Sequence, residues 1–238
     1  MKFIKLVINS LLDAVFPNKC VGCGEIIDKD YGLCEYCNEY ISKTVSDNRC
    51  RVCGCKKKEC QCKYRVFHFT ACTAPFYNED IARQVVYAFK FRRKQEFGNF
   101  LAERMALSVK NDFHDVDFNA LVYVPMPFKK ELKRGYNQSR ELALRLSKIL
   151  NIPIAENALG CNEKRYTQHK THAKYRFENV KGAFYPNLSL KGRRVLLVDD
   201  IKTTGATLDE CAKSLLKAGA EEVYCVTALI SKSKKKEG

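Results

Sequence analysis

From residue 64 onward, short apolar runs alternate with stretches whose apolar residues recur at helical spacing. Unbroken apolar runs are typical of strands that are buried on both faces of a parallel sheet. The predicted strands are 66–71, 73–77, 120–125, 195–198 and 222–230. The predicted helices are 81–89, a Leu-, Ala- and Met-rich segment after residue 94, 139–150 and 208–216. This alternation predicts an α/β fold with a mainly parallel sheet flanked by helices.

The two ends of the chain have patterns of their own. In residues 1–17, apolar residues at helical spacing are interrupted by polar ones such as Lys5 and Asp13. A signal peptide needs an uninterrupted apolar region, so we expect no export. We predict a short amphipathic helix that packs against the next module or, alternatively, binds a membrane or a partner protein. No apolar run approaches the roughly 20 residues that span a bilayer, and the lysine-rich residues 232–238 are predicted to be a disordered tail.

Residues 18–63 form a cysteine-rich module that is poor in apolar residues. The chain has 13 cysteines, and this odd count argues against a simple set of disulfides. The paired spacing favours structural zinc in a reducing cytosol, which predicts a cytoplasmic protein. The predicted ligands of two Zn(Cys)4 sites are Cys20, Cys23, Cys34, Cys37, Cys50, Cys53, Cys60 and Cys62. Cys55 is either spare or a substitute for a neighbouring ligand.

The charge of the chain points to a polyanionic partner. The formal net charge is +15, from 42 Lys and Arg against 27 Asp and Glu. Nucleic acid, a polyphosphorylated ligand or an acidic membrane face would each satisfy it. Lys56, Lys57 and Lys58 in the cysteine module either touch nucleic acid or form a solvated charged run.

The most informative stretch runs from Val195 to Leu208. Asp199 and Asp200 follow the buried run, at the end of a strand where open α/β sheets bind ligands. The turn that comes next leads directly into a predicted helix, and its residues are Thr203, Thr204, Gly205, Ala206 and Thr207. Its hydroxyls, backbone N–H groups and helix terminus suit a phosphate, whereas the carboxylates suit sugar hydroxyls or a divalent metal. A ribose 5′-phosphate with a magnesium-bound diol satisfies both halves.

A second basic segment follows the predicted strand 120–125. Lys129, Lys130 and Arg134 lie there, directly before Gly135-Tyr136-Asn137-Gln138. Cations beside a glycine at the end of a strand are a plausible seat for pyrophosphate. A solvated basic turn would explain the lysines but not the adjacent Asn137 and Gln138.

These motifs together resemble a known family. Val195–Leu208 resembles the phosphoribosyl pyrophosphate (PRPP) loop of type I phosphoribosyltransferases. Arg134–Gln138 resembles the R-G-[FY]-N-Q hallmark of the ComF family, which is associated with DNA uptake in naturally competent bacteria. Lys90-Phe91 resembles a step common in that family. The resemblance implies a phosphoribosyltransferase-like domain over 64–231 that is preceded by a double zinc ribbon.

The resemblance also implies roles for individual residues. Asp199 and Asp200 would take the ribose diol with Mg²⁺, and the residues Thr203, Thr204, Gly205, Ala206 and Thr207 would take the 5′-phosphate. Lys202 would add charge beside that phosphate, although a small or aliphatic residue is usual there. Lys129, Lys130 and Arg134 would face the pyrophosphate. His169–His172 also depart from the family's pattern, in a region that selects the acceptor in related transferases.

Three functional hypotheses follow. The first is a phosphoribosyltransferase in which a nitrogen acceptor displaces pyrophosphate, in DNA uptake or in nucleobase salvage. The second is a PRPP or nucleotide sensor without turnover, which the loop supports equally because the same residues bind and catalyse. The third is a factor that handles incoming single-stranded DNA together with proteins of the competence machinery. The zinc ribbon and the net charge favour the third, which is compatible with either of the others.

Overall fold

The computed structural model describes residues 17–27, 32–43, 49–60, 62, 65–77, 80–91, 96–163 and 176–231. The predicted amphipathic helix before Pro17, the segment His169–His172 and the tail 232–238 lie outside these residues.

The core of the molecule is a parallel sheet, as the sequence predicts. Its strands are β1 (Ala71–Thr73), β2 (Phe76–Tyr77), β3 (Ala120–Tyr123), β6 (Arg194–Lys202) and β7 (Glu222–Ile230). Their order is β1-β7-β6-β3, and β2 pairs with β7 beyond the end of β1. Every pairing in this sheet is parallel. Val195 to Val198 at its centre are fully buried, because helices cover both faces.

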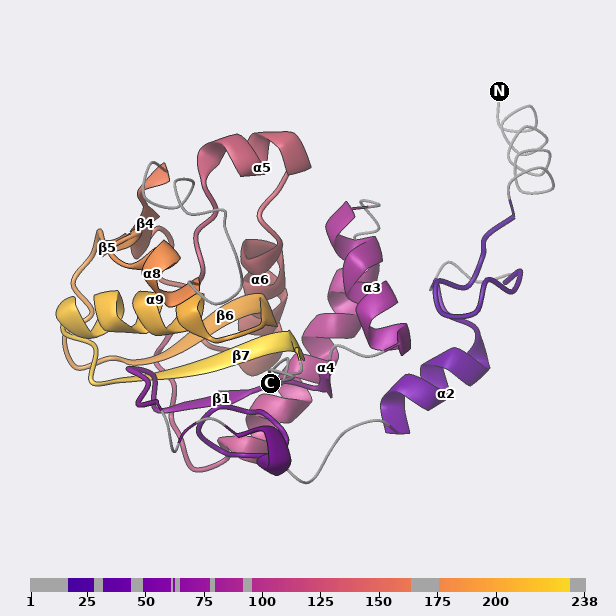
Figure 1. The fold of residues 1–238 in the computed structure, drawn as a ribbon, viewed down its shortest axis with the longest axis horizontal. Coiled ribbons are helices and arrows are strands. Elements are labelled where there is room, and N and C mark those ends of the chain that lie inside the picture. Colours follow the sequence, from indigo (N-terminus) through magenta and orange to yellow (C-terminus); the bar gives the residue numbers. More distant parts are fainter. Residues whose placement is uncertain are drawn as a thin grey trace, which may run out of the picture.

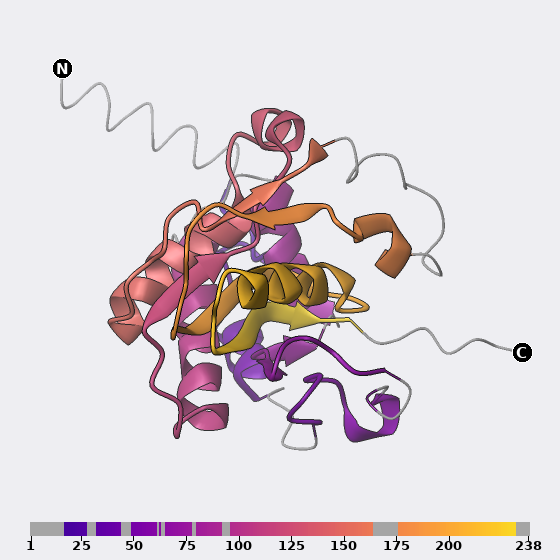
Figure 2. The same cartoon turned by 90° about the vertical axis from the view of Figure 1, so that its left-hand side faces the viewer.

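Two layers of helices cover the sheet (Figures 1 and 2). The helices α3 (Asp80–Phe91), α4 (Glu96–Asp112) and α6 (Gln138–Leu150) pack on the face that carries Leu196 and Val198. Helix α9 (Ala206–Lys217) packs on the face that carries Val195 and Leu197. This alternation follows from the two-residue period of a strand. None of the described helices combines the length and the apolar character needed to span a membrane.

The cysteine module meets the sheet domain at two separate places. Its first half contains helix α2 (Glu35–Lys43), and its buried residues Cys20, Cys37 and Ile41 belong to the core under α3 and α4. Its second half contains the short 3-10 helix η1 (Lys57–Glu59) and packs through Cys53 and Cys55 on Ala74, Tyr77 and Ile230. Figure 1 shows the first half beside α3 and the second half below β1.

The predicted strand 66–71 is wrong for all but its last residue. The His68 backbone N–H donates to Asp209 Oδ1 on α9 at 2.6 Å, so it is not available for strand pairing. Phe67 and Phe69 stack on each other with ring centroids 4.6 Å apart. Sheet hydrogen bonding begins only at Thr70, whose N–H donates to the Val223 carbonyl at 2.7 Å.

Three further elements differ from the sequence-based expectation. The basic segment after β3 is a short helix, α5 (Phe128–Arg134), that starts after Pro127 and ends at Gly135 with φ +87°. Pro at the start and Gly at the end are ordinary helix limits. Strand β6 extends four residues beyond the apolar run, to Lys202. The polar region holds a small antiparallel pair, β4 (Leu159–Cys161) and β5 (Phe184–Pro186), and helix α8 (Arg176–Val180).

The first knuckle, Cys20–Cys23, and the second knuckle, Cys50–Cys53, are each followed directly by a glycine. The two glycines lie in different surroundings. Gly24 (φ +83°) and Gly54 (φ +71°) both adopt the left-handed conformation. A Cβ on Gly24 would meet no atom of the described residues within 4 Å, whereas one on Gly54 would lie 2.5 Å from Ile230 Cδ1 and 2.7 Å from the Cys72 carbonyl oxygen. The second knuckle is therefore pressed against the sheet, and the first is open at this point.

We predict that Gly54→Ala destabilises the protein more than Gly24→Ala. Both substitutions put a Cβ on a left-handed backbone, which destabilises the folded state by about 1–2 kcal/mol. Only Gly54→Ala also overpacks its surroundings, which destabilises by roughly 1–3 kcal/mol more. Urea unfolding of both variants, with zinc content as a control, measures the difference. Equal destabilisation would show that the second knuckle is not seated on the sheet.

Candidate functional site

The two acids lie near the carboxyl end of β6 and are held by different helices. Asp199 Oδ1 accepts hydrogen bonds from Ser139 Oγ on α6 at 2.7 Å and from the Asp200 backbone N–H at 2.8 Å. Burial, followed by the neighbouring charge of Asp200, raises the pKa of the Asp199 carboxyl to about 7. The hydrogen bonds from Ser139 and the Asp200 N–H oppose this rise, as does the positive charge of Lys90. Asp199 therefore holds a proton more readily than an ordinary aspartate does.

Lys90 belongs to the acid site, although the local sequence pattern gave no reason to place it there. It lies in the last turn of α3, and its Nζ is 2.7 Å from Asp200 Oδ2. The two side chains are only 13% and 11% exposed, so this is a largely buried ion pair. The Lys90-Phe91 step was the one signal in the sequence, and it came from the family resemblance rather than from local periodicity.

The segment Arg134–Gln138 builds the frame of the acid site. The Tyr136 hydroxyl donates to the Phe89 carbonyl, directly before Lys90. Asn137 caps α6, since its Oδ1 accepts from the backbone N–H groups of Ser139 and Arg140 at 3.0 and 3.3 Å. Its Nδ2 donates to the Val124 carbonyl at 3.2 Å, beyond the end of β3. These contacts fix the helix ends that carry Lys90 and Ser139.

The predicted phosphate turn opens helix α9. Gly205 is its N-cap and has φ +84°, a conformation that favours glycine. The Thr204 Oγ1 accepts from the Ala206 N–H at 3.4 Å, Thr203 is exposed, and Thr207 is half-buried. The turn thus offers hydroxyls and N–H groups at the positive end of a 12-residue helix, an arrangement that suits a phosphate.

The predicted pyrophosphate residues lie at the same end of the sheet as the acids. Tyr123 of β3 pairs in parallel with Val198 of β6, and α5 follows the end of β3. Lys129 and Lys130 on α5 are exposed. Arg134 is half-buried, and its guanidinium donates to Gln138 Oε1 at 2.8 Å.

Lys202 lies below the phosphate turn. It is the last residue of β6, pairs with Ile230 of β7 and is 3% exposed. Its Nζ is 3.5 Å from Cys55 Sγ in the second half of the cysteine module and 6.0 Å from the centroid of the Phe67 ring. The ammonium therefore contacts the cysteine module, and a Cβ on Gly205 of the turn would lie 3.8 Å from it. Its expected role beside the phosphate stays a prediction.

The cysteines gather into two groups of four, as their spacing predicts. The groups are Cys20, Cys23, Cys34, Cys37 and Cys50, Cys53, Cys60, Cys62, and in each group all sulfurs lie within 4.8 Å of one another. The sulfur pairs Cys23–Cys34 and Cys50–Cys62 are 3.7 Å apart. Four sulfurs at the usual Zn–S distance of about 2.3 Å form a tetrahedron with edges of about 3.8 Å. Both groups thus fit a structural Zn²⁺ with no open coordination position.

Cys55 stands outside both groups and is buried. A hydrogen bond with Cys53 is the main cause that lowers the pKa of its thiol to about 7, burial opposes the shift, and the charge of Lys202 adds to it. Of the two roles left open by the sequence, the structure supports that of a cysteine outside the metal ligands.

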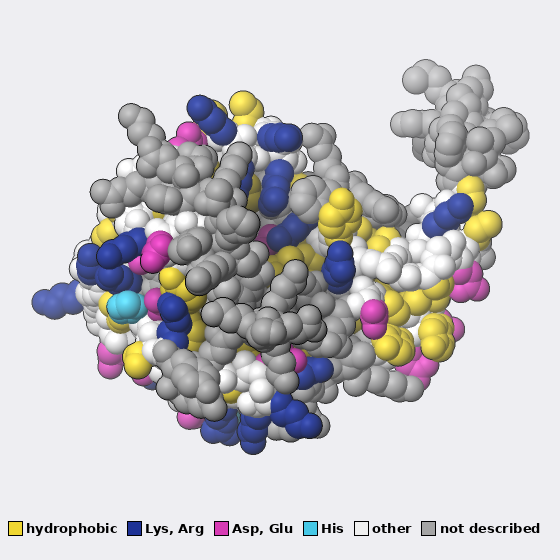
Figure 3. All heavy atoms as spheres, viewed as in Figure 1, with side chains coloured by type: hydrophobic (Ala, Val, Ile, Leu, Met, Phe, Trp, Pro, Cys, Tyr) yellow, Lys and Arg dark blue, Asp and Glu magenta, His cyan; other side chains and the backbone are white. Residues whose placement is uncertain are grey.

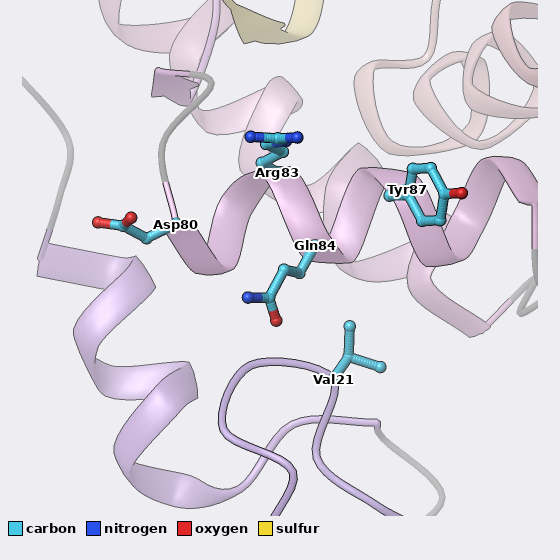
Figure 4. Close-up of a pocket in the computed structure, with 5 residues that line it drawn as sticks. All are labelled: Val21, Asp80, Arg83, Gln84 and Tyr87. Carbon is cyan, nitrogen blue, oxygen red and sulfur yellow. The ribbon is translucent and has the colours of Figure 1, made fainter.

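A cleft elsewhere in the molecule is not part of this site. It lies between the first half of the cysteine module and α3, and has a volume of about 430 Å³. The residues that line it are Val21, Asp80, Arg83, Gln84 and Tyr87 (Figure 4). Val21 belongs to the cysteine module, and the other four side chains come from the earlier turns of α3, whereas Lys90 lies in its last turn.

Comparison with known proteins finds both modules. A phosphoribosyl transferase domain model matches residues 137–238, and a double zinc ribbon domain model matches residues 11–75. Competence protein F from Haemophilus influenzae is 32% identical over 224 residues, which cover 87% of this chain and 95% of that protein. DNA utilization protein YhgH from Escherichia coli K12 is 29% identical, and the match covers 87% of this chain and 88% of YhgH. Among solved structures, glutamine PRPP amidotransferase from B. subtilis is similar to this chain, with 21% sequence identity and a TM-score of 0.39. The match covers 55% of this chain and 26% of the amidotransferase chain.

We predict that the purified protein contains two zinc ions per chain, and that chelation unfolds the cysteine module before the sheet domain. Cys23→Ser should lower the zinc content to about one ion, because it removes one of four ligands. Cys55→Ser is the matched control and should keep both ions. Metal analysis of the three proteins tests this, and a loss of zinc in Cys55→Ser would make Cys55 a ligand after all.

Proposed function

This chain belongs to the ComF family, and we propose that it binds PRPP with Mg²⁺ in a phosphoribosyltransferase-type site and acts in DNA uptake. The observation that carries the proposal is the succession of two carboxylates and a glycine-containing turn at the start of a helix, at the carboxyl edge of a parallel sheet. We place this activity in the cytoplasm, because reduced cysteines are needed as zinc ligands.

The acid pair would hold the ribose. Carboxylate oxygens accept hydrogen bonds from the two sugar hydroxyls, and Asp200 Oδ2 already accepts from Lys90 Nζ at 2.7 Å. Asp199 would have to release its proton to accept from a hydroxyl with both oxygens. Ser139 and the Asp200 N–H already fix the orientation of its Oδ1.

The turn at the start of α9 would bind the 5′-phosphate. The residues assigned to this role are Thr203, Thr204, Gly205, Ala206 and Thr207, which present hydroxyls and N–H groups toward one point. The partial positive charge at the helix start favours the phosphate by roughly 0.3–1 kcal/mol when exposed and more when partly buried.

The cations of α5 would bind the leaving pyrophosphate. A nitrogen acceptor would form a bond to the anomeric carbon as the bond from that carbon to the pyrophosphate oxygen breaks. Lys129, Lys130 and Arg134 would stabilise the charge that develops on this oxygen. Bound magnesium would supply a Lewis acid on the same pyrophosphate. Lys90 is a further candidate, because ligand binding at Asp200 would release its ammonium toward the leaving group.

Two other functions share the same site. A sensor would bind PRPP without turnover, and a salvage enzyme would transfer the ribose phosphate to a free nucleobase without any role in DNA uptake. Release of pyrophosphate on addition of candidate bases separates both enzymes from the sensor. Binding of single-stranded DNA separates a role in DNA uptake from salvage.

We predict that PRPP binds with magnesium dependence and that Asp200→Asn weakens binding about tenfold to a hundredfold. Each hydrogen bond to a charged group is worth about 1.5–3 kcal/mol. Asparagine is preferred to alanine, because it leaves the buried Lys90 ammonium with an acceptor. Thr204→Val removes one phosphate contact among several and should have a smaller effect. Titration calorimetry with PRPP, with and without magnesium, measures all three proteins.

Glu156→Gln is the control for this experiment. Glu156 is an exposed partner of Arg140 at 3.2 Å, and we expect its substitution to leave PRPP binding unchanged. If the wild-type protein does not bind PRPP at millimolar concentration, the assignment of the acid pair and the turn is wrong.

We further propose that the chain contacts single-stranded DNA through its basic surface, alone or together with proteins of the competence machinery. Lys and Arg side chains lie along several edges of the face in Figure 3. Lys57 and Lys58 on the second half of the cysteine module are exposed, as are Lys129 and Lys130 on α5. The first pair is independent of the PRPP site and therefore suits a DNA contact.

Affinity for labelled oligonucleotides should fall steeply with salt and depend little on base sequence. Replacing Lys57 and Lys58 by Gln should lower the slope of log affinity against log salt by about 1.4, since each phosphate contact on a single strand contributes about 0.7. The matched double variant of Lys129 and Lys130 should affect PRPP binding instead. No binding at low salt would assign the charge to phosphorylated ligands alone.

A further inference from the structure

Two residues without a role in the zinc ligand sets meet beneath the phosphate turn. Lys202 ends strand β6 with a buried ammonium, and Cys55 is the cysteine left over from the second group of ligands. They are 147 residues apart in sequence, yet Lys202 Nζ lies 3.5 Å from Cys55 Sγ in a buried contact. A buried ammonium and a thiol outside the ligand sets thus occupy the same place.

Burial of the Lys202 ammonium needs a compensating negative charge. Lys202 is 3% exposed, and an ammonium out of water costs several kcal/mol unless it is paired. Cys55 lies two residues after Cys53, one of the four thiols of the second group, and both are buried in the same cluster. Four thiolates around one Zn²⁺ carry a net negative charge, so the loaded group would supply a negative charge on the side of Lys202 that faces the cysteine module. Residues of this kind, outside the ligand set, commonly tune a metal site.

The same lysine supports the turn from below. A Cβ on Gly205 would lie 3.2 Å from Lys202 Cε and 3.2 Å from Phe67 Cε1, so the glycine rests on both side chains. A change in the position of Lys202 must therefore shift the turn. The segment that carries Cys55 is also fixed to the sheet. The Cys72 N–H of β1 donates to the Arg51 carbonyl at 3.4 Å, and Gly54 packs on Ile230 of β7.

We propose that the Lys202–Cys55 contact couples the second cysteine group to the phosphate turn, so that zinc in that group and a phosphorylated ligand at the turn stabilise each other. Lys202 and Cys55 are positioning residues in this arrangement and touch neither the metal nor the ligand. The ligand half of the statement rests on the proposed function, whereas the coupling between zinc and the turn does not.

The first cysteine group provides the internal comparison. Its buried members Cys20 and Cys37 pack under α3 and α4, on the opposite side of the sheet from α9. Coupling through Lys202 therefore predicts a specific effect of the second group on the turn. A general loss of stability would give no such difference between the two groups.

The test uses the full chain with Lys202→Met, Cys55→Ala and the double variant. Zinc release to a chromogenic chelator should show one phase for each group, and Cys23→Ala and Cys62→Ala identify which phase is which. In the absence of ligand, both single variants should speed release from the second group about fivefold or more, the lower end of typical coupling factors. Release from the first group should stay unchanged, and the double variant should match the single ones.

Hydrogen exchange supplies the second readout. Amides of residues 203–207 should exchange about fivefold faster or more in both single variants, also without ligand. The controls are Lys148→Met and Cys161→Ala, which replace an exposed lysine of α6 and a half-buried cysteine of β4, and neither should change the turn. Saturating PRPP with magnesium should slow zinc release from the second group in wild type but not in the Lys202 and Cys55 variants.

The outcomes separate the two proposals. If wild type binds no PRPP but the variants still accelerate zinc release and exchange in the turn, the proposed function fails and the coupling stands. If PRPP binds and the variants leave release and exchange at wild-type values, the coupling is wrong. Additive effects in the double variant would also overturn it, because residues that act through one contact are not additive.

Discussion

The need to pair charges at the carboxyl end of one buried strand organises this molecule. Strand β6 places Asp199, Asp200 and Lys202 within four residues at the centre of the sheet, and each is buried or half-buried. Unpaired charges there would cost several kcal/mol each. Helix α6 supplies Ser139, helix α3 supplies Lys90, and the cysteine module supplies Cys55. The elements around the sheet are therefore tied to the site by the chemistry of its residues as well as by apolar packing.

Sequence reasoning recovered the features whose signals are local. The apolar runs predicted β3, β6 and β7, and cysteine spacing predicted both groups of ligands, because a knuckle is made by neighbours in sequence. Long-range partners were missed for the same reason. Nothing near Lys90 shows that it meets Asp200, and nothing near Lys202 points to Cys55. The limits of α5, Pro127 and Gly135, were visible but were outweighed by the run of charges between them.

The Arg134–Gln138 segment shows how a binding motif can act through structure. The sequence analysis assigned its one cation, Arg134, to the pyrophosphate. Tyr136 and Asn137 of the same segment hold the ends of α3 and α6 and the end of β3 together. A polar cluster beside a site can act by positioning other residues without touching the ligand. Here the cluster sets the positions from which Lys90 and Ser139 reach the acids.

The packing of the second knuckle against the sheet constrains the order in which the chain can assemble. Gly54 lies against Ile230, the final residue of β7, and Cys55 lies against Lys202. Both partners leave the ribosome long after the cysteines do. A nascent chain can therefore load metal early, but it must keep the loaded knuckle undocked until synthesis has reached β7. The order of translation thus makes docking of this knuckle a late assembly step, with the sheet as its template.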